Sequence, residues 1–174
     1  MRYASTLGLV ALAATALACG AGGDGGADTA GSTGDAPKAA AKAARVGQAV
    51  RDGKFEFVVA KPTCGRTSVG PAQFGARAQG VYCLVAVTVK NIGKEAQLFS
   101  GSSQKAFDAK GIEFSNDGKA EMFANEGSPT FLEEINPGNR VKGNLIFDVP
   151  KGTKLARIEL HDSPFSGGVD VALG

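Results

Sequence analysis

The sequence predicts an all-β protein whose folded domain is an antiparallel β-sandwich of about seven to nine strands. Three observations support this prediction: apolar and polar residues alternate over several short segments, turn residues separate those segments, and the segments recur at short spacing. A period of two is typical of a half-buried strand, because successive side chains point to opposite faces. Residues 46–174 are expected to form this domain.

The alternating segments include residues 54–59, 81–90, 141–149 and 169–173. Alternation is strongest in the second of these, and five of its side chains share one face: Val81, Cys83, Val85, Val87 and Val89. Such a face is expected to pack in the core of the sandwich, since each strand of an antiparallel sheet buries one side and exposes the other.

Residues 155–160 are a further predicted strand, with Ala156, Ile158 and Leu160 on one face and Leu155 on the other. Turn sequences separate the strands, because Pro presets φ and Gly accepts φ > 0. They are residues 109–111, 116–118, 136–138 and 150–152. Residues 119–125 are compatible with one helical turn.

The N-terminus is typical of an export signal that ends in a lipidated cysteine. Residues 6–18 are a run of Ala, Leu, Val, Gly and Thr after a single basic residue, Arg2. The run is shorter than the roughly 20 apolar residues that span a bilayer, and it fits a signal peptide. Residues 16–19 resemble the bacterial lipobox, so we expect Cys19 to carry a diacylglycerol. Cleavage without lipidation and an unprocessed segment are the alternatives.

A flexible stalk is predicted between the signal and the folded domain. Residues 20–45 contain no aromatic and no large aliphatic side chain, so they bury too little apolar surface to offset the entropy of ordering. The predicted organisation is therefore a signal peptide over residues 1–18, the lipidated cysteine and its stalk over 19–45, and the sandwich over 46–174.

The charge of the predicted domain is close to neutral. Of 19 Lys and Arg and 17 Asp and Glu in the chain, four and three precede residue 46, which leaves 15 cations and 14 anions. These charges are interspersed along the sequence, so we expect neither a basic surface for nucleic acid nor a polybasic patch for anionic lipid. We expect no nucleic-acid partner.

Two cysteines remain once Cys19 is acylated. Cys64 and Cys83 form an even pair, which in an exported protein is expected to oxidise to a structural disulfide. This bond would join the end of one strand to the start of another. A redox pair and two unpaired thiols are the alternatives, although the spacing is not that of a Cys-x-x-Cys motif.

The segment between these cysteines, residues 65–82, is interpreted as a long loop on a rigid scaffold, where binding residues are common. Its candidate binding residues are Arg66, Gln73, Phe74 and Arg77. A loop that only crosses the end of the sandwich is the alternative. Residues 100–105 and 125–130 are the next candidate loops.

Side chains suited to catalysis or metal binding are sparse. His161 is the only histidine, and its neighbours Asp162 and Ser163 are interpreted with it as the end of a strand. One histidine and a cysteine pair make no zinc site. Four acidic residues without the spacing of a calcium loop are expected on a solvated edge: Asp108, Glu113, Asp117 and Glu121. We expect no enzymatic activity, no metal and no cofactor.

Several segments resemble a widespread family of uncharacterised bacterial lipoproteins. The most typical is residues 85–94, and the others are residues 47–50, 55–59, 136–138, 147–152 and 159–162. The resemblance implies an immunoglobulin-like domain of unknown function, similar in fold to a secreted mycobacterial immunoprotective antigen. Members of the family are sometimes mislabelled as telomeric-repeat-binding proteins. The chain lacks the Trp and the cysteine spacing of antibody domains.

These expectations combine into a lipoprotein that acts as a non-catalytic binding or interaction module of the cell envelope. The lipid on Cys19 would anchor it to the outer face of the cell membrane, unless it is secreted, and its partner would be a protein or a cell-wall component. A structural accessory of an envelope complex or wall polymer, and a small-ligand carrier, are the alternative functions.

Overall fold

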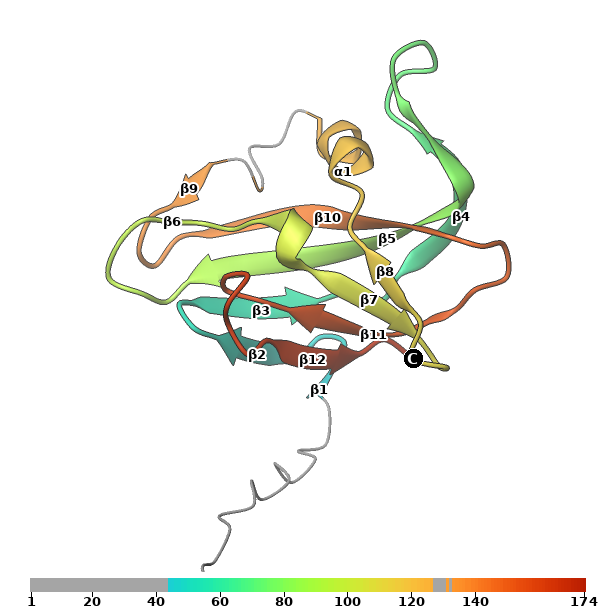
Figure 1. Ribbon diagram of the computed structural model, residues 1–174. Helices are drawn as coiled ribbons and strands as arrows, with labels where there is room; N and C mark the ends of the chain where they lie inside the picture. Colours follow the sequence, from blue (N-terminus) through green and yellow to red (C-terminus); the bar gives the residue numbers. More distant parts are fainter. Residues whose placement is uncertain (1–43, 127–130, 132) are drawn as a thin grey trace, which may run out of the picture. The chain divides into compact units, whose positions relative to one another are not determined.

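The computed structural model describes residues 44–126, 131 and 133–174, and Figure 1 traces the chain through them. The N-terminal half of these residues forms β1 (Ala44–Arg45), β2 (Ala49–Asp52), β3 (Phe55–Val59), β4 (Thr63–Val69), β5 (Ala76–Asn91), β6 (Gln97–Leu98) and the 3-10 helix η1 (Gly101–Ser103). The remainder forms β7 (Lys105–Asp108), β8 (Glu113–Ser115), α1 (Gly118–Ala124), β9 (Glu134–Ile135), β10 (Arg140–Val149), β11 (Leu155–Leu160) and β12 (Val169–Ala172). Neither helix in this part of the chain has the length and apolar character needed to span a bilayer.

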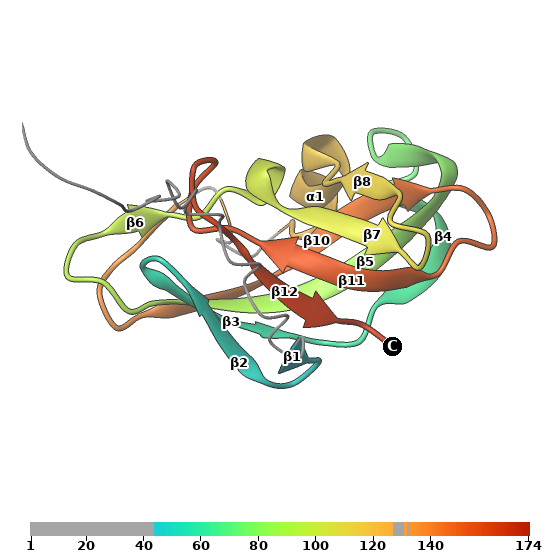
Figure 2. The ribbon, with the colours of Figure 1, turned by 60° about the horizontal axis from the view of Figure 1, so that its bottom comes forward.

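The strands form two main sheets. The β11 sheet has the order β1-β12-β11-β7-β8, and the β5 sheet has the order β10-β5-β3-β2, with β4 also paired to β5. Figure 2 shows β12, β11 and β7 side by side, with β3 and β5 of the other sheet behind them. Strands β6 and β9 form a small third pair. Every pairing is antiparallel except that of β1 with β12. The predicted β-sandwich is confirmed.

The two main sheets bury their facing sides against each other. Phe55, Phe57 and Val59 of β3 are fully buried in one core cluster with Ile158 and Leu160 of β11. The same cluster takes in Cys83, Val85, Val87 and Val89 of the face predicted for β5, and the partly buried Val81 packs against it. The alternation in the sequence therefore identified the inner faces of these strands, because a sheet that is buried on one side needs an apolar residue at every second position.

Strand β11 differs from its prediction at its first residues. Leu155 is buried, whereas Ala156 is partly exposed, so the expected faces of these two residues were wrong. The register between β7 and β11 shifts between Leu155 and Arg157, as in a β-bulge. A bulge adds one residue to a strand and reverses the alternation beyond it, which turns Leu155 inward together with Ile158.

The twelve described strands exceed the expected seven to nine because several are very short. β1, β6 and β9 have two residues each, too few to produce a periodic pattern. β1 also lies inside the predicted stalk, since Ala44 and Arg45 pair with Val171 and Ala172 of β12. The helical turn expected over residues 119–125 is present as α1.

Candidate functional site

The predicted binding loop between the cysteines is a β-hairpin. Residues 63–69 form β4 and pair with residues 76–84 of β5, so only residues 70–75 form a turn. The prediction of a long loop over residues 65–82 was therefore wrong. The pairing of β5 with β10 begins only at Val81, so residues 76–80 extend beyond β10, and in Figure 1 the turn of the hairpin projects beyond the sheets.

Among the long strands that the structure describes, β4 is the most exposed. All six residues from Thr63 to Ser68 are exposed, and Val69 is the first buried one. β4 pairs only with β5, so its other edge is open. Exposed edge strands of this kind can pair with another chain.

The hairpin carries all four candidate binding residues. Arg66 lies on β4, Gln73 and Phe74 lie in the turn, and Arg77 lies on β5. All four are exposed, and the Phe74 side chain is 74% exposed. The sequence has no acidic residue between positions 57 and 94, so the two arginines lack a carboxylate on their own hairpin.

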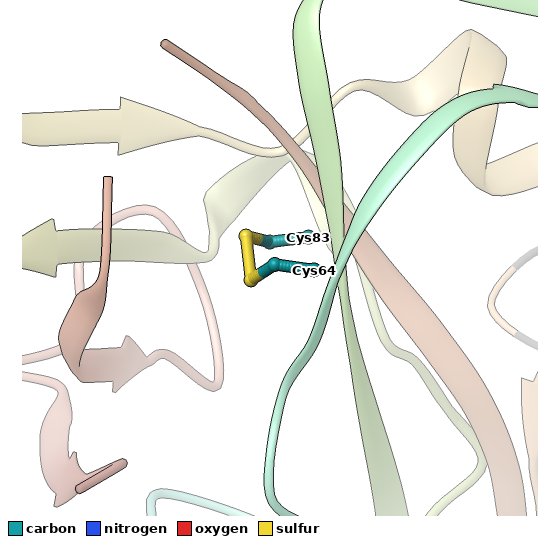
Figure 3. Close-up of a disulfide and its surroundings, with 2 residues drawn as sticks. All are labelled: Cys64 and Cys83. Carbon is teal, nitrogen blue, oxygen red and sulfur yellow. A yellow bond between two sulfur atoms is a disulfide. The ribbon is translucent and has the colours of Figure 1, made fainter. Parts of the chain in front are cut away.

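A disulfide joins the two strands at the base of the hairpin. Cys64 and Cys83 are opposite each other in the β4–β5 ladder and their sulfurs are bonded, as Figure 3 shows. The disulfide predicted from the sequence is confirmed. It lies within the ladder and not between the end of one strand and the start of another. Cys83 is fully buried in the core cluster, so the bond fixes the exposed β4 to the core.

Asp148 of β10 binds the backbone of β5 at the point where the hairpin leaves the sheet. Its carboxylate accepts the backbone N–H of Gln79 at 2.6 Å and that of Gly80 at 3.0 Å. A Cβ at Gly80 would overlap the carbonyl oxygen of Val149 and lie 2.9 Å from its carbonyl carbon. The backbones of β5 and β10 therefore approach too closely here for any residue except Gly.

Helix α1 supports the tip of the hairpin. Val69 and Ala76 of the hairpin share a buried apolar cluster with Ala120 of α1 and with Tyr82 and Ile146 of the β5 sheet. A Cβ at Gly70 would lie 2.8 Å from that of Phe123, so the turn rests directly on the helix. The β4–β5 hairpin, which we also call the arm (residues 63–84), is thus held in place by α1, although most of its side chains face solvent.

Polar contacts hold α1 on the sheet at both of its ends. Asp117 caps the N-terminus by accepting the backbone N–H of Ala120 at 2.9 Å, and it accepts the Tyr82 hydroxyl at 3.4 Å. Burial, and to a smaller extent the charge of Asp117, raises the pKa of Tyr82 to about 12. At the other end, the Asn125 amide exchanges hydrogen bonds with the backbone of Asn144 on β10.

Glu121 is buried under α1, so its expected place on a solvated edge was wrong. It is 8% exposed and lies against Gly101 of η1. The Asn116 side-chain amide donates to its carboxylate. Burial raises the pKa of Glu121 to about 7, against the smaller opposite effect of Asn116. The helical period explains the position, because Asp117, Glu121 and Asn125 repeat every four residues along the face toward the sheet.

His161 follows the end of β11 and contacts two polar side chains. Its Nε2 lies 2.8 Å from Glu159 Oε1, and its Nδ1 lies 3.4 Å from Ser166 Oγ. The Ser166 hydroxyl donates to the Ser163 carbonyl at 3.0 Å, so its proton is directed away from the imidazole. The arrangement braces the loop between β11 and β12.

Arg157 completes this polar cluster on the outer side of β11. It pairs with Glu159 at 3.0 Å and with Asp170, and its guanidinium lies 3.6 Å from the centre of the Phe107 ring. Burial raises the pKa of Glu159, but hydrogen bonds from Arg157 and His161 outweigh this effect and lower it. In the described ranges, no three His, Cys, Asp or Glu side chains lie close enough to hold a metal ion.

Some of the predicted features lie outside the described residues. These are the signal peptide, Cys19, nearly all of the stalk, and residues 127–130 of one candidate loop. The segment 100–105 is described and forms η1 and the start of β7. There the buried Gln104 side chain accepts the backbone N–H of His161 at 2.7 Å and supports the fold.

The sequence matches the family DUF4352, which is described as a domain of unknown function, over residues 44–171. The chain belongs to this family. It matches no curated protein in sequence. The match includes β1, in agreement with a folded domain that begins before the predicted boundary at residue 46.

Three solved structures resemble the fold at low sequence identity. The yjhA protein of Bacillus subtilis is 17% identical with a TM-score of 0.56, and the match covers 75% of this chain and 99% of that one. The secreted protein MPT63 of Mycobacterium tuberculosis is 17% identical with a TM-score of 0.52, over 74% and 92% of the two chains. A functionally unknown protein of Listeria monocytogenes is 14% identical with a TM-score of 0.53, over 75% and 83%.

Proposed function

We propose that this DUF4352 protein is an exported, membrane-tethered and non-catalytic interaction module whose β4–β5 hairpin contacts a partner of the cell envelope. The proposal rests on one observation: the side chains of the hairpin are exposed, yet its backbone is held firmly against the rest of the domain. Six successive residues of β4 are exposed, yet a disulfide, the Asp148 carboxylate and α1 fix the arm in place. A supported arm loses little conformational entropy on binding, which favours affinity.

The side chains of the arm favour an anionic partner surface. Arg and aromatic residues are enriched where protein interfaces gain most of their binding energy. Here Phe74 is exposed in the turn, and Arg66 and Arg77 lie on the two strands behind it. We infer that the aromatic ring inserts into the partner while the two guanidinium groups bind carboxylate or phosphate groups, as their fork geometry favours.

The sequence supports export and a tether. Residues 6–18 and Cys19 have the pattern of a lipoprotein signal, and the similarity in fold to the secreted MPT63 is in keeping with export. A lipid on Cys19 would hold the domain at the outer face of the membrane, with the stalk giving it reach. A structural accessory of an envelope complex or wall polymer is the second candidate. It would spread its contacts over a sheet face instead of the arm.

Cross-linking on living cells tests this proposal. A tagged chain is compared with a triple hairpin variant, Arg66→Ser with Phe74→Ser and Arg77→Ser, and the attached partners are identified by mass spectrometry. The matched control, Phe165→Ser with Lys110→Ser and Lys151→Ser, also removes one exposed Phe and two exposed cations. We expect the hairpin variant alone to lose the partner.

The thermal unfolding midpoints of both variants should stay close to that of the original chain, since exposed substitutions change stability by only about 0.5 kcal/mol. If the hairpin variant and the control recover the same amount of cross-linked partner, the hairpin is not the binding surface. A Cys19→Ala chain measures the contribution of the tether separately. We expect it to lose a membrane partner and to retain binding of that partner in solution.

A further inference from the structure

The outer face of the β5 sheet gathers cations that are far apart in the sequence. Arg140 and Lys142 of β10 lie opposite Lys90 and Thr88 of β5. Val87 and Val89 point into the core, so Thr88 and Lys90 between and beside them point outward. Lys61, just after β3, borders the same face. We call Lys61, Lys90, Arg140 and Lys142 the basic face.

The arrangement places like charges directly opposite each other. Lys90 and Arg140 are a cross-strand pair, and facing like charges destabilise a sheet. Glu56 lies opposite Lys90 on the other side, but its carboxylate is ion-paired with Arg51 at 2.7 Å. Within the described part of the chain, no residue of the basic face forms an ion pair. Its charge is therefore available to an external anion.

Carboxylates are few around this face. Besides Glu56, Glu134 of β9 lines a separate hollow together with Arg140. At the other end of the outer face, Asp148 is engaged by two backbone N–H groups. Positive charge thus dominates the part of the face that α1 leaves open.

A shallow hollow of about 420 Å³ adjoins the basic face at Lys61 and Lys142. Small and β-branched side chains form its floor, among them Val58, Ala86 and Thr88, while Lys61 and Lys142 border it. Lys61 and Lys142 are the two cations that line this hollow, and its other lining residues carry no charge. Lysine suits such a site because it binds phosphate as a point charge.

The hollow also adjoins the place where the chain enters the domain. Val46 and Gly47 line it, and they directly follow β1 and the end of the predicted stalk. The hollow therefore lies beside the N-terminal end of the described domain, to which the predicted stalk connects. The position of the chain entry and the charge therefore favour the same occupant.

We propose that the basic face binds the phosphate head groups of an anionic membrane surface. This goes beyond the proposed interaction module, because it uses a different surface from the β4–β5 hairpin and needs no protein partner. A basic patch near a lipid anchor gives a second membrane signal. It would hold the sandwich on the bilayer instead of at the full reach of the stalk.

Vesicle co-sedimentation tests the proposal without the lipid anchor. Residues 19–174 with Cys19→Ala are mixed with vesicles of phosphatidylcholine alone, or of phosphatidylcholine and phosphatidylglycerol in equal parts. We expect binding only to the second kind, with a steep loss at high salt because ionic contacts to a membrane surface are screened. Binding that is equal for both vesicles or insensitive to salt would overturn the proposal.

Two neutralised variants with the same change in charge locate the site. Gln replaces Lys61, Lys90, Arg140 and Lys142 in one, and the exposed Lys110, Lys119, Lys151 and Lys154 in the other. Each cation near an anionic surface contributes about a fivefold change in affinity, so the first variant should bind several hundredfold more weakly than the second. Equal losses would contradict a localised face.

A single substitution and a soluble polymer complete the test. Lys142→Gln alone, compared with Lys154→Gln, should lower binding about fivefold and avoids any folding defect of the fourfold variant. A soluble polyglycerol phosphate is the competing source of the same chemistry. If it binds the basic face while the anionic vesicles do not, the membrane is not the occupant and the proposal fails.

Discussion

Asn116 holds the buried carboxylate of Glu121 and the backbone of β10 at the same time. Its amide nitrogen donates to Glu121 and its amide oxygen accepts the N–H of Ile146 at 2.7 Å. This one side chain connects η1, α1 and the β5 sheet, since Glu121 also lies against Gly101. The helix that supports the hairpin thus rests on a buried acid whose pKa, about 7, is close to neutral pH.

Stability should fall as pH rises from about 5 to 8. The pKa of Glu121 is 4.5 in the unfolded chain and about 7 in the folded one, so the folded state holds a proton that the unfolded state releases in this interval. Stability is therefore lost as pH rises through the folded pKa, by up to about 3 kcal/mol from this group. Urea denaturation at several pH values measures the slope.

Glu121→Gln should remove most of this slope and be more stable than the original chain at pH 8. The exposed Glu113→Gln is the matched control and should leave the slope unchanged. A Glu121→Gln variant less stable than the original at pH 8 would show that the charged carboxylate is favourable where it lies.

Reduction of the disulfide should destabilise the domain by about 3 kcal/mol, from the loop that Cys64 and Cys83 close across 19 residues. Thermal denaturation with and without a phosphine reductant measures this, and Cys64→Ala with Cys83→Ala should reproduce the reduced value. We expect β4 to exchange its amide protons first on reduction, because it pairs only with β5. Unchanged unfolding temperatures on reduction would contradict this role of the bond.

Gly80→Ala should destabilise the domain by more than about 2 kcal/mol, since the new methyl group overlaps the Val149 carbonyl in a closely packed backbone. Gly118→Ala is the control. It has open space around its Cβ position and begins α1 without a positive φ, so it should stabilise by up to about 1 kcal/mol. Chemical denaturation compares them, and equal effects would rule out a steric cause.

The Tyr82 phenol should ionise near pH 12, because burial and the charge of Asp117 both raise its pKa. Residues 19–174 contain no other tyrosine, so ultraviolet absorbance during an alkaline titration reports this residue alone. Ionisation in the unfolded chain begins near pH 10, and stability should therefore fall between pH 10 and 12.

Asp117→Asn isolates the contribution of charge to the Tyr82 pKa. Asn also caps helices well, so α1 should be retained while the pKa of Tyr82 falls. An unchanged titration in this variant would attribute the shift of Tyr82 to burial and to the charge of Asp148, without a contribution from Asp117.

The sequence by itself determined which residues face the core in the main strands. The alternation in Phe55–Val59 and in the segment 81–90 identifies the inner faces, because side-chain direction in a strand depends only on position along it. The cysteine pair also followed from the sequence, since an exported chain with two remaining cysteines tends to bond them. The departure at Leu155 did not follow from it, because a bulge depends on the neighbouring strand.

Tertiary structure alone decided which distant residues meet. Residues 65–82 contain the turn glycines and polar side chains of a loop, and only the pairing of β4 with β5 makes them a hairpin. The sequence around Glu121 is that of a solvated acid, and only the packing of α1 on the sheet buries this side chain. Lys90 and Arg140 are fifty positions apart and become neighbours only through the β5–β10 register. Sheet register is set by long-range contacts, so the interspersed charges along the chain gave no sign of the basic face that folding assembles.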